Sequence, residues 1–169
     1  MQCDLTALGY VSRPEVIIDP GITAVSVIPG KIDGVDVMIK THKNNIEGRE
    51  HYNNEKNAYL VLQNEDFLPK LLYFDDSNLK LCMTDVGKAT TTFEHLDLLL
   101  YYDELRHSVI NIMNKKYNVF HNDLHIKNVC IDEKNKIRII DFDRASIGGT
   151  RKDTDGSFLN YIRKGLHKW

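Results

Sequence analysis

Cysteine is scarce in this chain of 169 residues, which has three widely spaced cysteines and no C-x-x-C pair among them (Cys3, Cys82 and Cys130). This number and spacing favour neither a disulfide framework nor a zinc site, so we expect a reducing compartment. Long apolar runs are also missing, since none approaches the ~18 residues of a membrane span. The N-terminal residues lack the features of a secretory signal, and Gln2 stands where myristoylation needs glycine. These absences predict an intracellular, cytoplasmic protein with no membrane partner.

The chain also lacks an excess of one charge, because 22 basic and 24 acidic residues give a net charge of −2. This balance argues against a protein that coats nucleic acid, so a nucleic-acid partner is not expected. Hydrophobic residues make up 42% of the chain and charged residues 27%, as in ordinary globular proteins. We therefore expect one folded domain with a real core, and the sequence leaves its oligomeric state open.

Residue periodicity changes character about halfway along the chain. Alternation and β-branched residues predict strands at 16–18, 23–28, 35–39, 68–74 and 79–84, and a helical spacing predicts a helix over 51–63. Beyond Gly87 the pattern predicts a long amphipathic helix over 98–117, a hairpin of strands 129–131 and 137–140, and a short final helix around 153–162. The prediction is an α+β fold with a β-rich part, 1–84, and a helical part, 85–169.

Three oxygen-bearing side chains lie at the ends of the predicted hairpin. Asp123 and Asn128 precede its first strand, and Asp141 follows its second strand. Because a hairpin brings its outer ends together, these side chains should converge on a small volume that suits Mg²⁺ and phosphate oxygens. Any one of them alone is more often a turn residue. The order strand, H-x-D-L-x-x-x-N, hairpin, D-F favours the metal site.

This order resembles the protein-kinase superfamily, whose catalytic loop H-R-D-L-x-x-x-N and metal-binding D-F-G have the same separation. The resemblance implies a two-lobed kinase-like fold that binds ATP and Mg²⁺. It implies that Asp123 is the catalytic base and that Asn128 and Asp141 hold the metal. His121 matches a residue whose role in the family is mainly structural.

The resemblance extends upstream to the segment Val37-Met38-Ile39-Lys40, which is similar to V-A-I-K on the third strand of the family. This match makes Lys40 the lysine that holds the α- and β-phosphates. Its implied ion-pair partner is Glu55, which lies in the middle of the predicted helix, whereas Glu47 and Glu50 are the competing acids.

Further nucleotide contacts are implied on either side of that lysine. Gly21 matches the glycine-rich loop, although this chain has one glycine where the family pattern has three. The backbone of Thr84 and Val86 falls where the hinge of the family contacts adenine. Asp143 replaces the glycine of D-F-G, which makes a mobile switching segment less favourable because aspartate adopts positive φ less readily.

Only 26 residues follow Asp143, too few for an activation segment and a full helical subdomain. The expectation is a truncated C-terminal lobe, similar to the minimal kinase-like proteins of some viruses and to small atypical kinases, with activity in the cytoplasm, including that of a virus-infected host cell. Asp155, with Asp153 as competitor, would hold the catalytic loop backbone.

The expected function is transfer of the ATP γ-phosphoryl group to a serine or threonine hydroxyl of a protein. Lys127 would offset charge at the transferred group. A protein substrate or regulatory partner would dock near the basic stretch 144–168. Two alternatives stay open: a pseudokinase binding module, motivated by the poor glycine-rich loop, and a small-molecule kinase of the aminoglycoside or choline type, motivated by the run Asp123-Leu124-His125.

Overall fold

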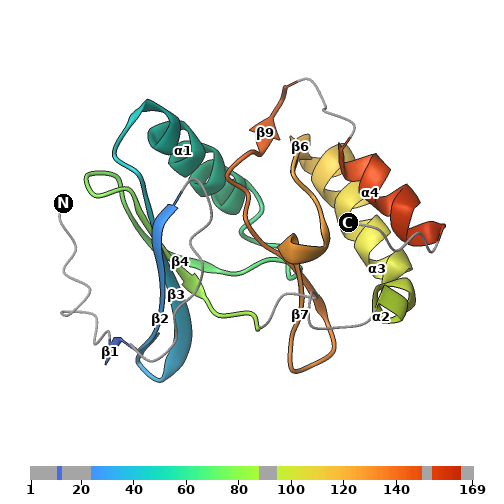
Figure 1. The fold of residues 1–169 in the computed structure, drawn as a ribbon, viewed down its shortest axis with the longest axis horizontal. Coiled ribbons are helices and arrows are strands. Elements are labelled where there is room, and N and C mark those ends of the chain that lie inside the picture. Colours follow the sequence, from blue (N-terminus) through green and yellow to red (C-terminus); the bar gives the residue numbers. More distant parts are fainter. Residues whose placement is uncertain (1–10, 13–23, 88–94, 150–153, 165–169) are drawn as a thin grey trace.

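A five-stranded antiparallel sheet dominates one side of this mixed α+β protein (Figure 1). The structure is a computed structural model and describes residues 11–12, 24–87, 95–149 and 154–164. The strand order is β1-β2-β3-β5-β4. The strands are β1 (Val11–Ser12), β2 (Ala24–Ile32), β3 (Val35–His42), β4 (Leu71–Asp75) and β5 (Lys80–Thr84). Helix α1 (Ile46–Val61) contacts β3 and β4 and lies between the sheet and the rest of the molecule.

Strand β2 continues through Pro29, where the sequence predicts that a strand ends. Pro29 pairs with Met38 of β3, whereas β1 covers only Gly30 and Lys31 of β2. Among the described residues, β2 therefore has one hydrogen-bonding neighbour at Pro29 rather than two, a position that tolerates a residue without an N–H group. The predicted strands over 35–39, 68–74 and 79–84 are present as β3, β4 and β5 with shifted ends, and the strand predicted at 16–18 lies outside the described residues.

Helix α1 begins five residues before the predicted start because Asn45 caps it. The Asn45 side chain accepts a hydrogen bond from the Gly48 backbone N–H at 2.7 Å, which satisfies one of the unpaired donors of the first turn. Gly48 is buried, and a Cβ at this position would lie 2.0 Å from the carbonyl oxygen of Lys43. The turn from β3 into α1 is therefore closed by a backbone approach that only glycine allows.

Helices dominate the other side of the molecule (Figure 1). The single long helix predicted over 98–117 is divided at Tyr101 and continues as a wider π-helix. The segments are α2 (His95–Leu100), α3 (Tyr102–Arg106), the π-helix η3 (His107–Lys116) and α4 (Thr154–Arg163). No helix among the described residues is both long and apolar enough to cross a membrane.

The predicted hairpin lies between the sheet and the helices. Strands β7 (Val129–Ile131) and β8 (Ile137–Ile139) pair antiparallel, and the short 3₁₀ helix η4 (Ile126–Asn128) leads into them. Strands β6 (Val119–Phe120) and β9 (Ser146–Ile147) form a second pair beside α1. The backbone N–H of Ile139 donates to the carbonyl of Phe67 at 2.7 Å, which joins the hairpin to the connection between α1 and β4.

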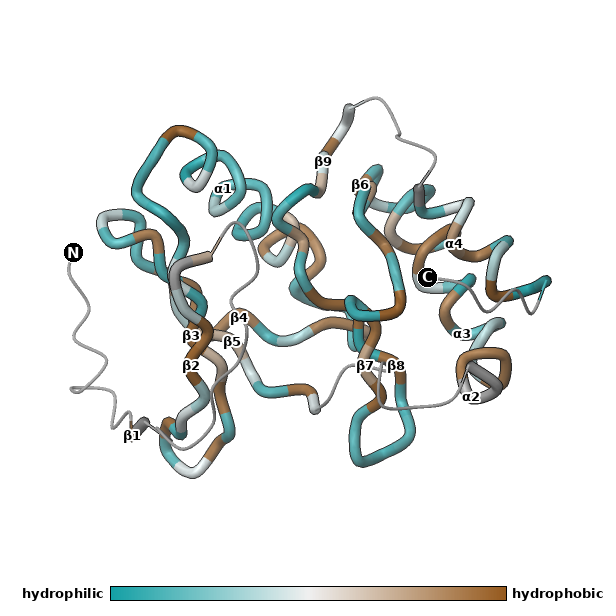
Figure 2. Tube along the Cα trace, in the orientation of Figure 1, coloured by the Kyte–Doolittle hydropathy of each residue, from teal (hydrophilic) through white to brown (hydrophobic). Residues whose placement is uncertain are grey.

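One hydrophobic core contains residues from both sides of position 84. The buried residues that belong to it include Tyr59 of α1, Leu62 at the end of that helix, Leu81 of β5, Leu105 of α3 and Ile137 of β8. Figure 2 shows apolar residues concentrated in the central strands and in the α2 and α3 region, with polar residues at the tip of the β7–β8 hairpin. The hairpin is therefore held by the same core that anchors α1.

The close approach at Gly48 predicts that adding a single methyl group at this position lowers the stability of the protein strongly. We expect Gly48→Ala to lower the free energy of unfolding by about 2 kcal/mol or more, because backbone must move to admit the Cβ. Urea denaturation followed by circular dichroism measures this change. Asn53→Ala, at an exposed position of the same helix, is the control and should be neutral or slightly stabilising. Equal stability of the two variants would contradict the packing at Gly48.

Candidate functional site

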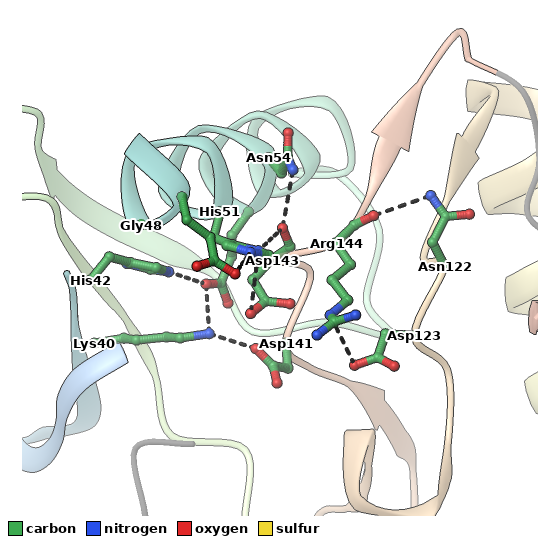
Figure 3. Close-up of polar contacts among 12 residues, drawn as sticks. Lys40, His42, Gly48, His51, Asn54, Asn122, Asp123, Asp141, Asp143 and Arg144 are labelled. Atoms are coloured by element: carbon green, nitrogen blue, oxygen red, sulfur yellow. Dashed lines mark hydrogen bonds and ion pairs between the residues drawn. The ribbon is translucent and has the colours of Figure 1, made fainter. Parts of the chain in front are cut away.

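The Lys40 ammonium lies between two carboxylates that come from different elements (Figure 3). Lys40 is near the end of β3 and pairs with Leu81 of β5 and Val27 of β2, so strands flank it on both sides. Its Nζ is 2.8 Å from Oε2 of Glu55 on α1 and 2.5 Å from Oδ1 of Asp141, which follows β8. Glu55 is thus the acid that pairs with Lys40, in preference to Glu47 and Glu50.

Lys40 and Glu55 are the two buried groups of this cluster, and they form an ion pair that is held away from water. Burial by itself would lower the pKa of Lys40, but the carboxylates of Glu55 and Asp141 override it and raise that pKa above its usual range. Burial would likewise raise the pKa of Glu55, but the Lys40 ammonium and the hydrogen bond from His42 lower it to about 2. Both groups therefore carry their charges at neutral pH.

His42 is a fourth member of the cluster, which the sequence did not predict. It lies two residues beyond Lys40 on β3, and its Nε2 is 3.0 Å from the same Glu55 oxygen that Lys40 contacts. Because a carboxylate oxygen accepts hydrogen bonds, Nε2 of His42 carries a hydrogen and donates the hydrogen bond to Glu55. The ring packs edge-on against Tyr52 of α1 at 5.6 Å between centroids. The period-two alternation of a strand, which puts residues 40 and 42 on one face, is a signal that identifies it.

Asp141 adopts an unusual backbone conformation, with φ of 65°. This left-handed value is uncommon for a residue other than glycine, although aspartate is one of the residues that adopts it most readily. In the segment Asp141-Phe142-Asp143, here called the D-F-D segment, the left-handed residue is therefore Asp141 and not Asp143. The next residue, Phe142, is fully buried and packs against the rings of Tyr59 at 5.4 Å and His121 at 4.7 Å. The buried ring anchors the segment beside α1.

The backbone of the loop that carries Asp123 is held by the buried carboxylate of Asp155. Asp155, in the first turn of α4, accepts hydrogen bonds from the backbone N–H groups of His121 at 2.9 Å and Asn122 at 3.0 Å. The predicted competitor Asp153 lies outside the described residues. His121 donates from Nε2 to the carbonyl of Ile140 at 2.9 Å, which ties this loop to the segment that follows β8.

Asp123 is partly exposed to solvent and lies near the Arg144 guanidinium and the His125 ring. Its carboxylate is 37% exposed, and its Oδ2 is 3.8 Å from both Nε of Arg144 and Nε2 of His125. Burial lowers the pKa of His125, and the charges of Asp123 and Asp141 act in the opposite direction without cancelling it. The Lys127 side chain is exposed on η4.

The residues predicted to hold a metal occupy neighbouring segments. The backbone carbonyl of Asn128 accepts from the N–H of Ile140 at 3.0 Å, one residue before Asp141. The Asn128 amide nitrogen donates to the carbonyl of Asp123 at 2.9 Å. No group of three or more His, Cys, Asp or Glu residues suited to a metal occurs among the described residues. One carboxylate and one amide oxygen fit Mg²⁺, which is held by few protein ligands and takes phosphate and water oxygens for the rest.

The predicted adenine contacts lie at and beyond the end of β5. Thr84 Oγ1 accepts from the backbone N–H of Lys70 at 2.9 Å, and the Thr84 N–H donates to the Lys70 carbonyl at 3.0 Å. These bonds fix the end of β5 against the start of β4. Val86 follows β5 outside any helix or strand and is half-buried. Gly21 lies outside the described residues.

Neither a scan against models of known protein families nor a search of curated proteins found a match for this chain. The roles of the site residues therefore depend on the contacts themselves. These bring Lys40, Glu55 and Asp141 into one ionic cluster, and they place the Asp123 loop against the segment that carries Asp141.

The pH dependence of stability should report the ionised state of Glu55. Because the pKa of this carboxyl is lowered from 4.5 to about 2, its contribution is complete above pH 4.5 and is lost as the pH falls toward 2. We expect the unfolding free energy of the wild type to fall more steeply across this window than that of Glu55→Gln, by about 3 kcal/mol in total. Urea denaturation at a series of pH values measures both slopes.

The control for this measurement is Glu50→Gln, at an exposed position of the same helix. It should keep the slope of the wild type. A Glu55→Gln variant that is as acid-sensitive as the wild type would contradict the buried ion pair.

Proposed function

We propose that this protein is an ATP-dependent phosphotransferase with a two-lobed, kinase-like architecture, and that it acts on serine or threonine hydroxyls of proteins. The observation that carries the proposal is the buried Lys40 ammonium, held by Glu55 from α1 and by Asp141 from the segment after β8. A lysine so fixed, beside a carboxylate that is 36% exposed, suits the positioning of a triphosphate and its metal.

The reaction assigns one role to each residue of the site. Lys40 holds the α- and β-phosphates, Glu55 holds Lys40, and His42 holds the Glu55 carboxylate. Asp123 orients the acceptor hydroxyl and takes its proton while the hydroxyl oxygen bonds to the γ-phosphorus. The bond from that phosphorus to the bridging oxygen breaks, and ADP leaves. Lys127 offsets negative charge at the transferred group.

Asn128 and Asp141 are the residues that would hold Mg²⁺. When bound, the ion neutralises charge on the phosphates. The carboxylate of Asp141 needs this ion or the Lys40 ammonium beside a triphosphate, since two anions otherwise repel each other. Lys40 and the metal therefore share the task of making that carboxylate compatible with ATP.

The surroundings of Asp123 support a protein acceptor. Its carboxylate is more than one-third exposed, and the neighbouring Arg144 and Lys127 are exposed as well. A base that reaches solvent in this way is accessible to a hydroxyl presented on another protein. A small-molecule acceptor is more often enclosed by the pocket that binds it.

Binding of ATP should depend on the divalent ion. At an ATP concentration about 100 times its dissociation constant, we expect Mg²⁺–ATP to raise the thermal unfolding midpoint by roughly 5 °C or more. ATP with a chelator should raise it far less, and Lys40→Met should weaken the shift with Mg²⁺. Lys115→Met, at an exposed position of η3, is the matched control and should respond like the wild type. Equal shifts with and without Mg²⁺ would count against the metal site.

Turnover should depend on Asp123 far more than binding does. We expect Asp123→Asn to lower phosphoryl transfer about 100-fold or more while the Mg²⁺–ATP thermal shift stays unchanged, because the amide keeps the shape and loses the charge. The assay follows labelled phosphate from ATP into general protein substrates, with phosphoamino acid analysis of the products. Asp103→Asn, at an exposed position of α3, is the control.

Other outcomes of that assay, with aminoglycosides and choline added as acceptors, would contradict parts of this proposal. Near-normal turnover of Asp123→Asn removes Asp123 as the base. A wild type that binds Mg²⁺–ATP and transfers no phosphate to any acceptor is a binding module without catalysis. Transfer to aminoglycosides or choline, and to no protein, indicates a small-molecule kinase.

A further inference from the structure

Two side chains of α1 bind the same backbone carbonyl of the D-F-D segment (Figure 3). His51 Nδ1 is 2.9 Å from the carbonyl oxygen of Asp143, and Asn54 Nδ2 is 3.1 Å from it. A carbonyl oxygen only accepts, so both nitrogens donate, and Nδ1 of His51 carries a hydrogen. We call this pair of contacts the Asp143 clasp.

The following carbonyl is held from the opposite side. Asn122, on the loop that carries Asp123, donates from Nδ2 to the carbonyl of Arg144 at 3.1 Å and to Oγ of Ser146 at 2.9 Å. Successive carbonyls of one segment thus receive side-chain donors from α1 and from the catalytic loop. These donors are amide and imidazole side chains of the chain itself and need no added phosphate.

The clasp lies close to the two acids that hold Lys40. Asn54 is the residue before Glu55, and His51 is one helical turn before it, so both are carried by the helix that carries Glu55. Asp143 follows Asp141 by two residues, and Phe142 between them is buried. Helix α1 therefore contacts the Lys40 cluster through Glu55 and the segment of Asp141 through the clasp.

We propose that His51 and Asn54 are positioning residues that fix the Asp141 carboxylate for Mg²⁺–ATP by holding the carbonyl of Asp143. This role rests on the proposed function of Asp141. Asp141 is only partly buried and its backbone is left-handed, so the side chain depends on neighbouring contacts to stay in place. The clasp holds the backbone two residues beyond Asp141 without any modification of the chain, whereas phosphorylation-dependent kinases order the corresponding segment with new arginine–phosphate pairs.

The test compares two double variants of the full chain. His51→Ala/Asn54→Ala removes the clasp, and Glu50→Ala/Asn53→Ala changes two exposed positions of α1 with the same spacing. Hydrogen exchange without any ligand is measured on peptides that cover residues 139–147, where the amides of Ile140 and Ala145 are hydrogen-bonded. We expect exchange there to be about tenfold faster in the first variant, with strands β3 to β5 unchanged, and no change in the control. Unchanged exchange in the first variant overturns the clasp, and this result does not depend on whether the protein binds ATP.

The second measurement is the Mg²⁺ concentration that gives half of the ATP-induced thermal shift. We expect it to rise at least fivefold in His51→Ala/Asn54→Ala and to stay within twofold of the wild type in Glu50→Ala/Asn53→Ala. A merely structural role would lower the ligand-free midpoint and leave this Mg²⁺ concentration unchanged, which would overturn the positioning role. A wild type that shows no Mg²⁺-dependent shift overturns the proposed function, and the positioning role with it, even where the exchange result supports the clasp.

Discussion

The buried ammonium of Lys40 is the constraint on which the rest of the site depends. A charge removed from water is stable only when a partner compensates it, and breaking such a pair by removing one partner costs about 3–5 kcal/mol. Lys40 therefore requires Glu55 and Asp141 to remain where they are, 2.8 and 2.5 Å from its nitrogen. The hydrogen bond from His42 to Glu55 strengthens this requirement, because it fixes the carboxylate from a second direction.

The remaining elements meet this requirement in separate ways. Strand β3 lies between β2 and β5, so Lys40 is attached to the central strand of the sheet, which is paired on both sides. The close turn at Gly48 sets how α1 leaves that strand, and so where Glu55 lies. On the other side, Phe142 anchors the Asp141 segment in the core beside Tyr59 of the same helix. Helix α1 is thus the element through which the sheet and the hairpin region are aligned.

The catalytic-loop candidate depends on one buried carboxylate in a similar way. Asp155 accepts two successive backbone N–H groups, at His121 and Asn122, and so fixes the backbone immediately before Asp123. The Asp123 side chain itself remains more than one-third exposed. The molecule therefore combines a buried cluster around Lys40 with an accessible carboxylate on a braced loop, and the proposed phosphotransferase function depends on this combination.

The sequence by itself determined the local elements and the candidate residues. Alternation identified β3 and β5, turn residues identified the β7–β8 hairpin, and the spacing of Asp123, Asn128 and Asp141 around that hairpin indicated that they meet. Tertiary structure alone decided that Pro29 continues its strand, that Asp141 is left-handed, and that His51 and Asn54 bind the Asp143 carbonyl. The reason is physical: periodicity reports which face a residue occupies, whereas a contact such as that of Lys40 with Asp141, 101 residues apart, depends on how separate elements pack.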